Sequence, residues 1–265
     1  MPRHTFRLAA ALTLLTIPVG TALCSGGWRR RSSSSQRAEQ ERLARIASAV
    51  DEGSIDDFEK ARVNQVGGEN AATYGEITPR GLASLATRLR LGPSSRFADL
   101  GSGVGAAVLR AASEYDMEYA CGVELAASRH ARAVERLQRA PLEVASRVRF
   151  VLGDCAGDDT WLDGGPLSTV THVWIASLLY SPELMTRLAR RLSSAESSSV
   201  RAIATLRRFP DGVRGFVEEE PPEPCEMSWT ARIALSSGAG ADDEWAHPGS
   251  PVYIYRRQTA DDGTG

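Results

Sequence analysis

The stretch RFADLGSGVGAAVLRAA, residues 96–112, constrains the fold of this chain more than any other. It begins as a short apolar run, passes through three glycines at alternate positions, and continues as a helix-forming segment. Glycines in a tight turn between a strand and a helix let the backbone approach a ligand, and the first N–H groups of the helix carry partial positive charge. We therefore predict that Gly101, Gly103 and Gly105 form a loop that cradles a nucleotide-like molecule.

The segments around this loop alternate between apolar runs and helical patterns. Such alternation requires a parallel sheet with helices on both faces, and ligands bind to these sheets at the carboxyl ends of the strands. Near the C-terminus, CEMSWTARIAL and SPVYIYRR predict an antiparallel hairpin at the sheet edge. The expected fold is therefore α/β and Rossmann-like, mostly parallel with an antiparallel edge hairpin. Its five parallel strands are expected at residues 96–100, 119–124, 148–153, 170–175 and 200–206.

Composition supports a folded chain and sets its expected divisions. The 265 residues are 42% hydrophobic and 24% charged, which allows a substantial core. We expect a helical cap with a covering loop at 39–77, the Rossmann-like domain at 78–257 and a disordered tail at 258–265. Within the domain, the acidic run Glu218 to Glu220, followed by two prolines, predicts a solvated loop. The four cysteines lack metal-ligand spacing, so we expect no metal and no disulfide framework.

Residues 1–38 differ in composition from the rest of the chain. An apolar run from Leu8 to about Cys24 lies between arginines, is followed by four serines, and no acidic residue precedes Glu39. This composition predicts a signal peptide, an uncleaved membrane anchor or an organellar transit segment. The expected location is the secretory pathway, a membrane or an organelle rather than the nucleus. The net charge of −2 is spread over both signs and gives no strong nucleic-acid signature.

Three acidic residues end three of the predicted strands beside the glycine loop. Glu124 can accept hydrogen bonds from both ribose hydroxyls of a nucleotide, and Asp154 can receive an adenine amino group. The glycine spacing fits both the GxGxxG/A loop of dinucleotide enzymes and the GxGxG loop of methyltransferases. An NAD-type oxidoreductase explains Glu124 but has no particular need for Asp99. S-adenosylmethionine explains all three acids better, because its amino-acid portion lies against the first loop.

The motifs FADLGSGVG and CGVEL resemble the S-adenosylmethionine site of class I methyltransferases. Upstream, ATYGEITPRGLASLATRL is similar to the disruptor-of-telomeric-silencing family of non-SET lysine methyltransferases, and the resemblance extends over roughly residues 60–193. It implies a loop that closes over the methionine end of the cofactor through Tyr74, Glu76 and Thr78. The contacts that it implies for the loop, ribose and adenine fall on Asp99, Gly101, Gly103, Glu124 and Asp154.

The sequence departs from that family where the acceptor would lie. The family places two asparagines at the end of the fourth strand, and this chain has Ala176 and Ser177 there. The resemblance implies a protein-lysine N-methyltransferase with an unidentified protein substrate, and we expect Tyr74, Glu76 and Ser177 to position the acceptor. Two alternatives remain open, an NAD-type oxidoreductase and a catalytically inactive protein that binds S-adenosylmethionine as a scaffold.

Overall fold

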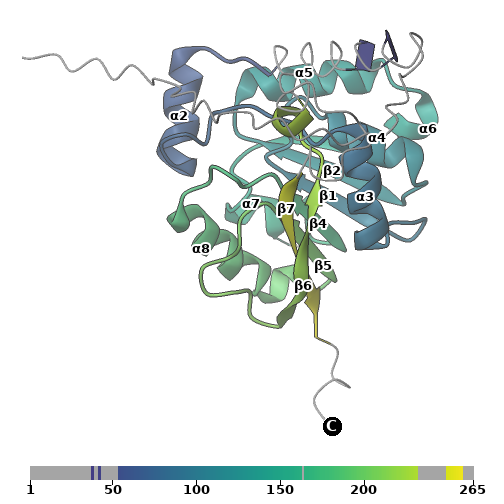
Figure 1. Cartoon of the computed structure of the whole chain (residues 1–265). Coiled ribbons are helices and arrows are strands. Elements are labelled where there is room, and N and C mark those ends of the chain that lie inside the picture. Colours follow the sequence, from purple (N-terminus) through teal and green to yellow (C-terminus); the bar gives the residue numbers. More distant parts are fainter. Residues whose placement is uncertain (1–36, 39–40, 43–52, 163, 232–248, 259–265) are drawn as a thin grey trace, which may run out of the picture.

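The computed structural model describes residues 37–38, 41–42, 53–162, 164–231 and 249–258 (Figure 1). Nearly all of the predicted targeting segment, and the tail beyond Gln258, lie outside the described residues. Within those ranges, no helix has both the length and the apolar character needed to cross a membrane.

A seven-stranded sheet in the order β3-β2-β1-β4-β5-β7-β6 forms the centre of the molecule. The first five strands in this order are parallel, and β7 pairs antiparallel with both β5 and β6. From β1 the chain moves outward through β2 to β3 and then returns to β4, so the strand order reverses between β1 and β4. The predicted fold class is confirmed. The strands are β1 (Arg96–Leu100), β2 (Tyr119–Glu124), β3 (Val148–Leu152), β4 (His172–Ile175), β5 (Ala202–Thr205), β6 (Phe216–Cys225) and β7 (Ser250–Arg257).

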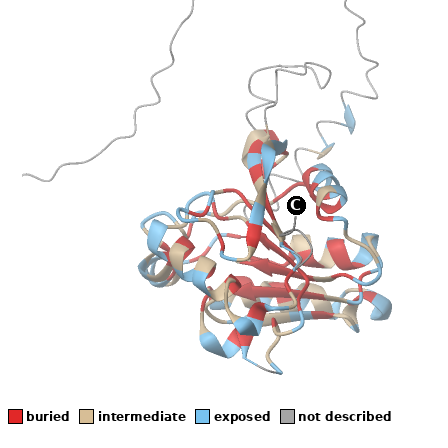
Figure 2. Ribbon diagram, turned by 90° about the horizontal axis from the view of Figure 1, so that it is seen from below, coloured by how far each residue is buried: buried red, intermediate tan, exposed pale blue. Residues whose placement is uncertain are grey.

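Helices cover both faces of this sheet, whose strands form the buried centre (Figure 2). On one face, leucines of α3 pack with Phe97 and Trp174, and α4 and α6 continue that layer. On the other face, α8 contributes Leu184, Met185 and Leu188 to the larger core cluster. The described helices are α2 (Asp57–Gly67), α3 (Pro79–Leu89), α4 (Ala106–Glu114), α5 (Ala127–Gln138), α6 (Leu142–Ala145), α7 (Asp158–Trp161), α8 (Pro182–Leu192) and the 3₁₀ helix η1 (Ala195–Ser197).

Local capping explains where two of these helices begin. Thr78 precedes α3 and Ser181 precedes α8, and each hydroxyl accepts an N–H from the first turn, at 3.1 and 3.2 Å. In both helices a proline follows the cap, at a position where its missing N–H costs no hydrogen bond. α3 therefore begins at a Thr-Pro pair and α8 at a Ser-Pro pair.

The edge hairpin corrects two sequence predictions. The run Glu218 to Glu220 and the prolines after it form β6 and not a solvated loop. Prolines are tolerated there because an edge strand needs hydrogen-bond donors on one side only, and the pairing with β7 shifts between Glu219 and Glu223. Ion pairs to Arg208 and Arg256 hold the glutamates. The predicted strand in CEMSWTARIAL is also wrong over residues 226–231, because only Cys225 belongs to β6 and residues 228–231 are helical; residues 232–235 lie outside the described residues.

Candidate functional site

The glycine loop lies between β1 and α4, beside the point where the strand order reverses. Gly101, Gly103 and Gly105 have φ values of 93°, 55° and 79°, a region that residues with a Cβ rarely adopt. A Cβ on Gly101 would overlap the hydroxyl of Tyr180, and one on Gly103 would overlap the ring of Tyr74. Two tyrosines therefore cover the loop closely, and the loop requires glycine for both its conformation and this approach.

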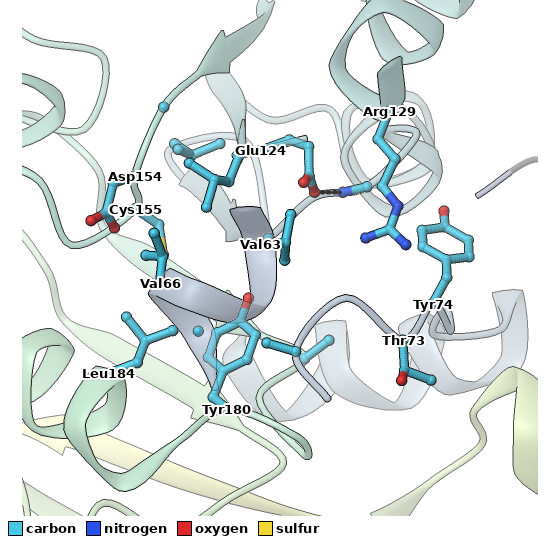
Figure 3. A pocket seen from close by; sticks show the side chains of 18 of the residues that line it. Val63, Val66, Thr73, Tyr74, Glu124, Arg129, Asp154, Cys155, Tyr180 and Leu184 are labelled. Carbon is cyan, nitrogen blue, oxygen red and sulfur yellow. Dashed lines mark hydrogen bonds between the residues drawn. The ribbon is translucent and has the colours of Figure 1, made fainter. Parts of the chain in front are cut away.

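Glu124 ends β2 and fixes the glycine loop from the neighbouring strand. Its side chain is 5% exposed. The Gly103 N–H donates to Oε2 (Figure 3), and the Ala126 N–H donates to Oε1, each at 2.8 Å. Because each carboxylate oxygen can accept two hydrogen bonds, both oxygens keep a second acceptor site while they line the cleft. Glu124 can thus hold the loop and bind a ligand hydroxyl together.

Asp99 lies within β1, two residues before the first glycine. It is 4% exposed, and its Oδ1 has no hydrogen-bond partner among the residues that the structure describes. Burial, together with the negative charges of Glu124 and Glu76, raises the pKa of this carboxyl to about 8. With Glu76 it lines a small cavity at the start of α4. A buried acceptor among other carboxylates is suited to a positively charged ligand group.

Tyr74 and Glu76 form the part of the covering loop that touches the glycine loop. The Tyr74 hydroxyl donates to the Glu76 carboxylate and accepts the Val104 N–H at 3.4 Å. Burial and the adjacent Glu76 raise the pKa of Tyr74, so the phenol stays protonated. The Glu76 N–H donates to the Ser228 hydroxyl at 3.1 Å, and the Ser228 N–H donates back to the Glu76 carbonyl at 2.8 Å. The covering loop is therefore held on one side by the glycine loop and on the other by Ser228.

A cleft runs from this loop to the far end of β3. Its walls come from α2, the covering loop, the strand ends and α8, and its volume is about 90 Å³ (Figure 3). Asp154 lies at the far end, where its Oδ1 accepts the Ala156 N–H at 2.9 Å and its Oδ2 pairs with Arg187 of α8 at 2.5 Å. The structure therefore brings Tyr74, Glu124 and Asp154 to one cleft.

A second cavity of about 210 Å³ opens beside the cleft and shares Tyr74, Ala176 and Tyr180 with it. Its remaining walls include Trp229, Leu178 and Leu179, and none of its lining residues is charged. The two leucines are 43% and 42% exposed. We call this cavity the apolar channel; Tyr74 and Tyr180, which cover the glycine loop, form part of its wall.

Two residues predicted for the site have other contacts in the structure. Ser177 is fully buried, and its hydroxyl bonds the Thr205 hydroxyl at 2.5 Å and accepts the Arg207 N–H at 3.1 Å. It joins the ends of β4 and β5 instead of facing the apolar channel. Thr78 caps α3 and donates to the Glu226 carboxylate at 2.5 Å. The hydroxyls of Ser177 and Thr78 are thus used in hydrogen bonds at the end of β4 and at the start of α3. The sequence spacing could not reveal these contacts.

Sequence reasoning missed Arg129, whose side chain is 5% exposed and lines the cleft. Its guanidinium lies over the Tyr74 ring, 4.7 Å from the ring centroid (Figure 3). The available signal was an arginine on the same helical face as Ala126 and Ala133, where an apolar residue is expected. Tyr180, which we expected in the pocket wall, donates to the Leu100 carbonyl at 3.2 Å and covers Gly101.

The model of the family described as Histone methylation protein DOT1 matches residues 59–149, which contain most of α2, the loop with Tyr74 and Glu76, the glycine loop and Glu124. The resemblance found in the sequence is thereby confirmed for these residues. No curated protein sequence matches the chain.

Solved structures with similar folds include three bound to S-adenosyl-L-homocysteine. A Geobacter sulfurreducens SAM-dependent methyltransferase is 24% identical, with 60% of this chain and 55% of that chain covered and a TM-score of 0.36. A Thiobacillus denitrificans SAM-dependent methyltransferase is 17% identical, with 69% and 92% covered and a TM-score of 0.42. A Salinibacter ruber RNA methyltransferase is 18% identical, with 67% and 91% covered and a TM-score of 0.42.

Proposed function

We propose that this chain, a class I methyltransferase that takes S-adenosylmethionine as its cofactor, transfers the methyl group to the side-chain amine of a lysine in a protein. The observation that carries the cofactor site is the buried Asp99 Oδ1, which lacks a hydrogen-bond partner among the described residues. The family description Histone methylation protein DOT1 and the uncharged channel support the acceptor.

Charge favours a cationic ligand over a dinucleotide at this loop. Glu124 and Glu76 act on Asp99 strongly enough to help raise its pKa to about 8. A ligand ammonium next to Asp99 offsets this repulsion and supplies the missing donor to Oδ1. The diphosphate of NAD would instead bring further negative charge to the same loop. The site therefore suits the amino-acid portion of S-adenosylmethionine.

The residues present fit the other parts of this cofactor. Asp99 and Glu76 would hold its ammonium group, Glu124 would accept from the ribose hydroxyls, and Asp154 would accept from the adenine amino group. When bound, the cofactor supplies a methyl group on a positively charged sulfur. The protein then contributes mainly orientation and exclusion of water, effects that can lower a barrier by about 7 to 11 kcal/mol.

A lysine amine must lose a proton before it can accept a methyl group. The apolar channel supports a lysine acceptor because it favours this loss. An ordinary lysine has a pKa of about 10.4, so its amine is charged at neutral pH. A channel walled by Ala176, Tyr180 and Trp229 lowers the pKa of an entering amine, because burial disfavours the ammonium form. The methylene stem of lysine also packs well against aromatic and aliphatic walls. The channel thus favours the neutral nucleophile.

Tyr74 and Glu76 are proposed to position the acceptor at the inner end of this channel. Tyr74 lines both the channel and the cleft, and its hydroxyl is oriented by the Glu76 carboxylate. Its ring closes the space above Gly103 and excludes water from the reacting end. Ser177 takes a supporting role in this proposal, because its hydroxyl bonds Thr205 and Arg207.

Two measurements on the whole chain test the proposal. Calorimetric titration should detect binding of S-adenosylmethionine and S-adenosylhomocysteine and no binding of NAD. Incubation with methyl-labelled cofactor and an extract of the source organism should then label protein, and hydrolysis should release the label as methyllysine. Label that resists protease and is removed by ribonuclease would reject the lysine proposal while leaving the cofactor assignment intact. Tight cofactor binding without any labelling would favour the scaffold alternative.

We also propose that residues 1–38 direct the chain out of the cytosol. The acid-free, Arg- and Ser-rich stretch after the apolar run supports this proposal. A fluorescent reporter fused behind residues 1–38 should leave the cytosol, whereas one fused to residues 36–265 should remain there. The same cytosolic distribution for both fusions would reject it.

A further inference from the structure

Residues 53–77, the covering segment, lie over the cleft and contain α2 and the loop with Tyr74 and Glu76. The cavity beneath is about 90 Å³. Pockets that hold ligands of cofactor size are larger, roughly 300–1,000 Å³. Cofactor exchange therefore requires this segment to move, and the contacts that hold it in place control that movement.

The first turns of α5 provide these contacts. The Ser128 N–H donates to the carboxylate of Glu59 in α2 at 2.8 Å. Arg132 donates to the Ser54 carbonyl at 2.7 Å. Arg129 donates through Nε to the Gly53 carbonyl at 2.8 Å and through Nη2 to the Ala72 carbonyl at 2.7 Å. Of these side chains, Arg129 alone joins the two ends of the covering segment, one on each side of α2.

Arg129 also touches the functional end of the segment. Its guanidinium stacks on the Tyr74 ring with 4.7 Å to the centroid, and the Tyr74 hydroxyl contacts both Glu76 and the glycine loop. Among the described residues, no carboxylate lies within ion-pairing distance of this buried guanidinium. A buried charge destabilises the protein unless it has polar or aromatic partners. Separating Arg129 from its two carbonyls and the Tyr74 ring therefore costs free energy.

We propose that Arg129 is the positioning residue that keeps the covering segment closed and thereby sets the rate at which cofactor and product leave; the cofactor part of this inference rests on the proposed function. A planar guanidinium reaches two carbonyls in one plane while its face stacks on an aromatic ring. The ammonium of lysine has no such face or fork. Arg129→Lys therefore keeps the charge and removes the geometry.

The matched control is Arg132→Lys, because Arg132 lies one turn further along α5 and donates to the Ser54 carbonyl, on the N-terminal side of α2. Stopped-flow displacement should show S-adenosylhomocysteine leaving Arg129→Lys more than about tenfold faster than the unaltered chain. Arg132→Lys should change this rate less than about threefold. The rate constant for methyl transfer in a single turnover should fall less than the dissociation rate rises. A dissociation rate within twofold of the unaltered chain, in a folded Arg129→Lys protein, would overturn the proposal.

Amide hydrogen exchange provides a readout that needs no cofactor. In the ligand-free Arg129→Lys chain, residues 70–77 should exchange faster than in the unaltered chain, while the strands β1 and β2 keep their protection. Equal exchange in residues 70–77 would overturn the proposal even if the chain binds a ligand other than S-adenosylmethionine. If Arg129→Lys fails to fold, Glu59→Gln weakens a second tie from α2 to α5, and the same two measurements should show a smaller change in the same direction.

Discussion

The two halves of the sheet present different chemistry at their carboxyl ends. On the side of β1, β2 and β3, the carboxylates of Glu124 and Asp154 face the cleft, and Asp99 lines the small cavity that adjoins it. On the side of β4 and β5, the channel walls are Ala176, Leu178 and Leu179, and the polar side chain of Ser177 is satisfied internally. The difference separates two tasks. Fixed polar groups hold a ligand of constant shape, whereas an uncharged passage admits a varying partner.

If the carboxylate half alone binds the cofactor, Glu124→Ala should produce the largest loss. Two charged hydrogen bonds to the ribose are worth about 3 to 6 kcal/mol together, which corresponds to a dissociation constant roughly 150- to 25,000-fold larger. The substitution also leaves the Gly103 and Ala126 N–H groups without their present acceptor. Calorimetry with S-adenosylmethionine measures the loss, and circular dichroism checks the fold. Unaltered affinity in a folded variant would remove Glu124 from the ribose site.

Asp99→Asn should weaken cofactor binding by roughly 10- to 100-fold and change how binding depends on pH. The pKa of Asp99 is raised to about 8, so the ligand-free chain carries a protonated carboxyl at pH 7. A cationic ligand binds the ionised form, so affinity for S-adenosylmethionine should rise by up to about tenfold per pH unit from pH 6 to 8 and then level off. The Asn variant should lose this dependence. Titration of the unaltered chain and of the Asn variant with S-adenosylmethionine at four pH values measures this difference.

The same carboxyl predicts the sign of a stability effect. Asp99 has a higher pKa in the folded chain than the value of about 3.9 expected when unfolded. The folded state therefore binds more protons, and the ligand-free chain loses stability as pH rises from about 4 to 8. Asp99→Asn should remove this loss and raise the melting temperature at pH 8 by at least about 2 °C, with little change at pH 5. A lower melting temperature at pH 8 would show that Asp99 stabilises the empty site.

Turnover should depend on the covering loop more than on the end of β4. Tyr74→Phe and Glu76→Gln should each lower the rate of methyl transfer by more than about tenfold, or about 1.4 kcal/mol in the transition state. Ser177→Ala should cost less than that, because the Ser177 hydroxyl bonds Thr205 and Arg207 and lies away from the channel. Label incorporation at saturating cofactor gives these rates. The reverse order would place acceptor positioning on the strand end.

The smallest effect is expected at the mouth of the apolar channel. Leu179→Ser should raise the KM for the protein acceptor by about three- to tenfold, because it removes one partly exposed apolar contact. The affinity for S-adenosylmethionine should stay the same, since Leu179 lines the channel and not the cofactor cleft. A loss of cofactor affinity equal to the loss of acceptor affinity would mean that the two halves do not act separately.

The carboxylate half was accessible from the sequence because its information is local. Asp99 and Glu124 each lie at or near the end of a short apolar run, and parallel strands bring such ends to one edge. The ligand contacts of these carboxylates then follow from the residue type and from its position along the strand. For the same reason the glycine loop was predicted between a strand and a helix, and it lies between β1 and α4.

The channel half depends on contacts between distant segments. Ser228 holds Glu76 across 152 residues, and Trp229 packs against Gly75, although neither pair is marked by any local pattern. In β6 a local pattern is present, but it predicts the wrong structure. Its prolines and glutamates are strong loop signals, but an edge strand with arginine partners tolerates both. Arg129 was missed because a single buried arginine on a helix has no partner nearby in the sequence.

The double use of Glu124 has a consequence for how such chains diverge. One carboxylate both builds the glycine loop, through the Gly103 and Ala126 N–H groups, and faces the ligand cleft. Selection for a folded domain would retain this residue after selection for activity had ceased. The motif that first draws attention in the sequence is therefore a record of ancestry and architecture, whereas evidence of present-day catalysis must be sought at Tyr74, Glu76 and the walls of the channel.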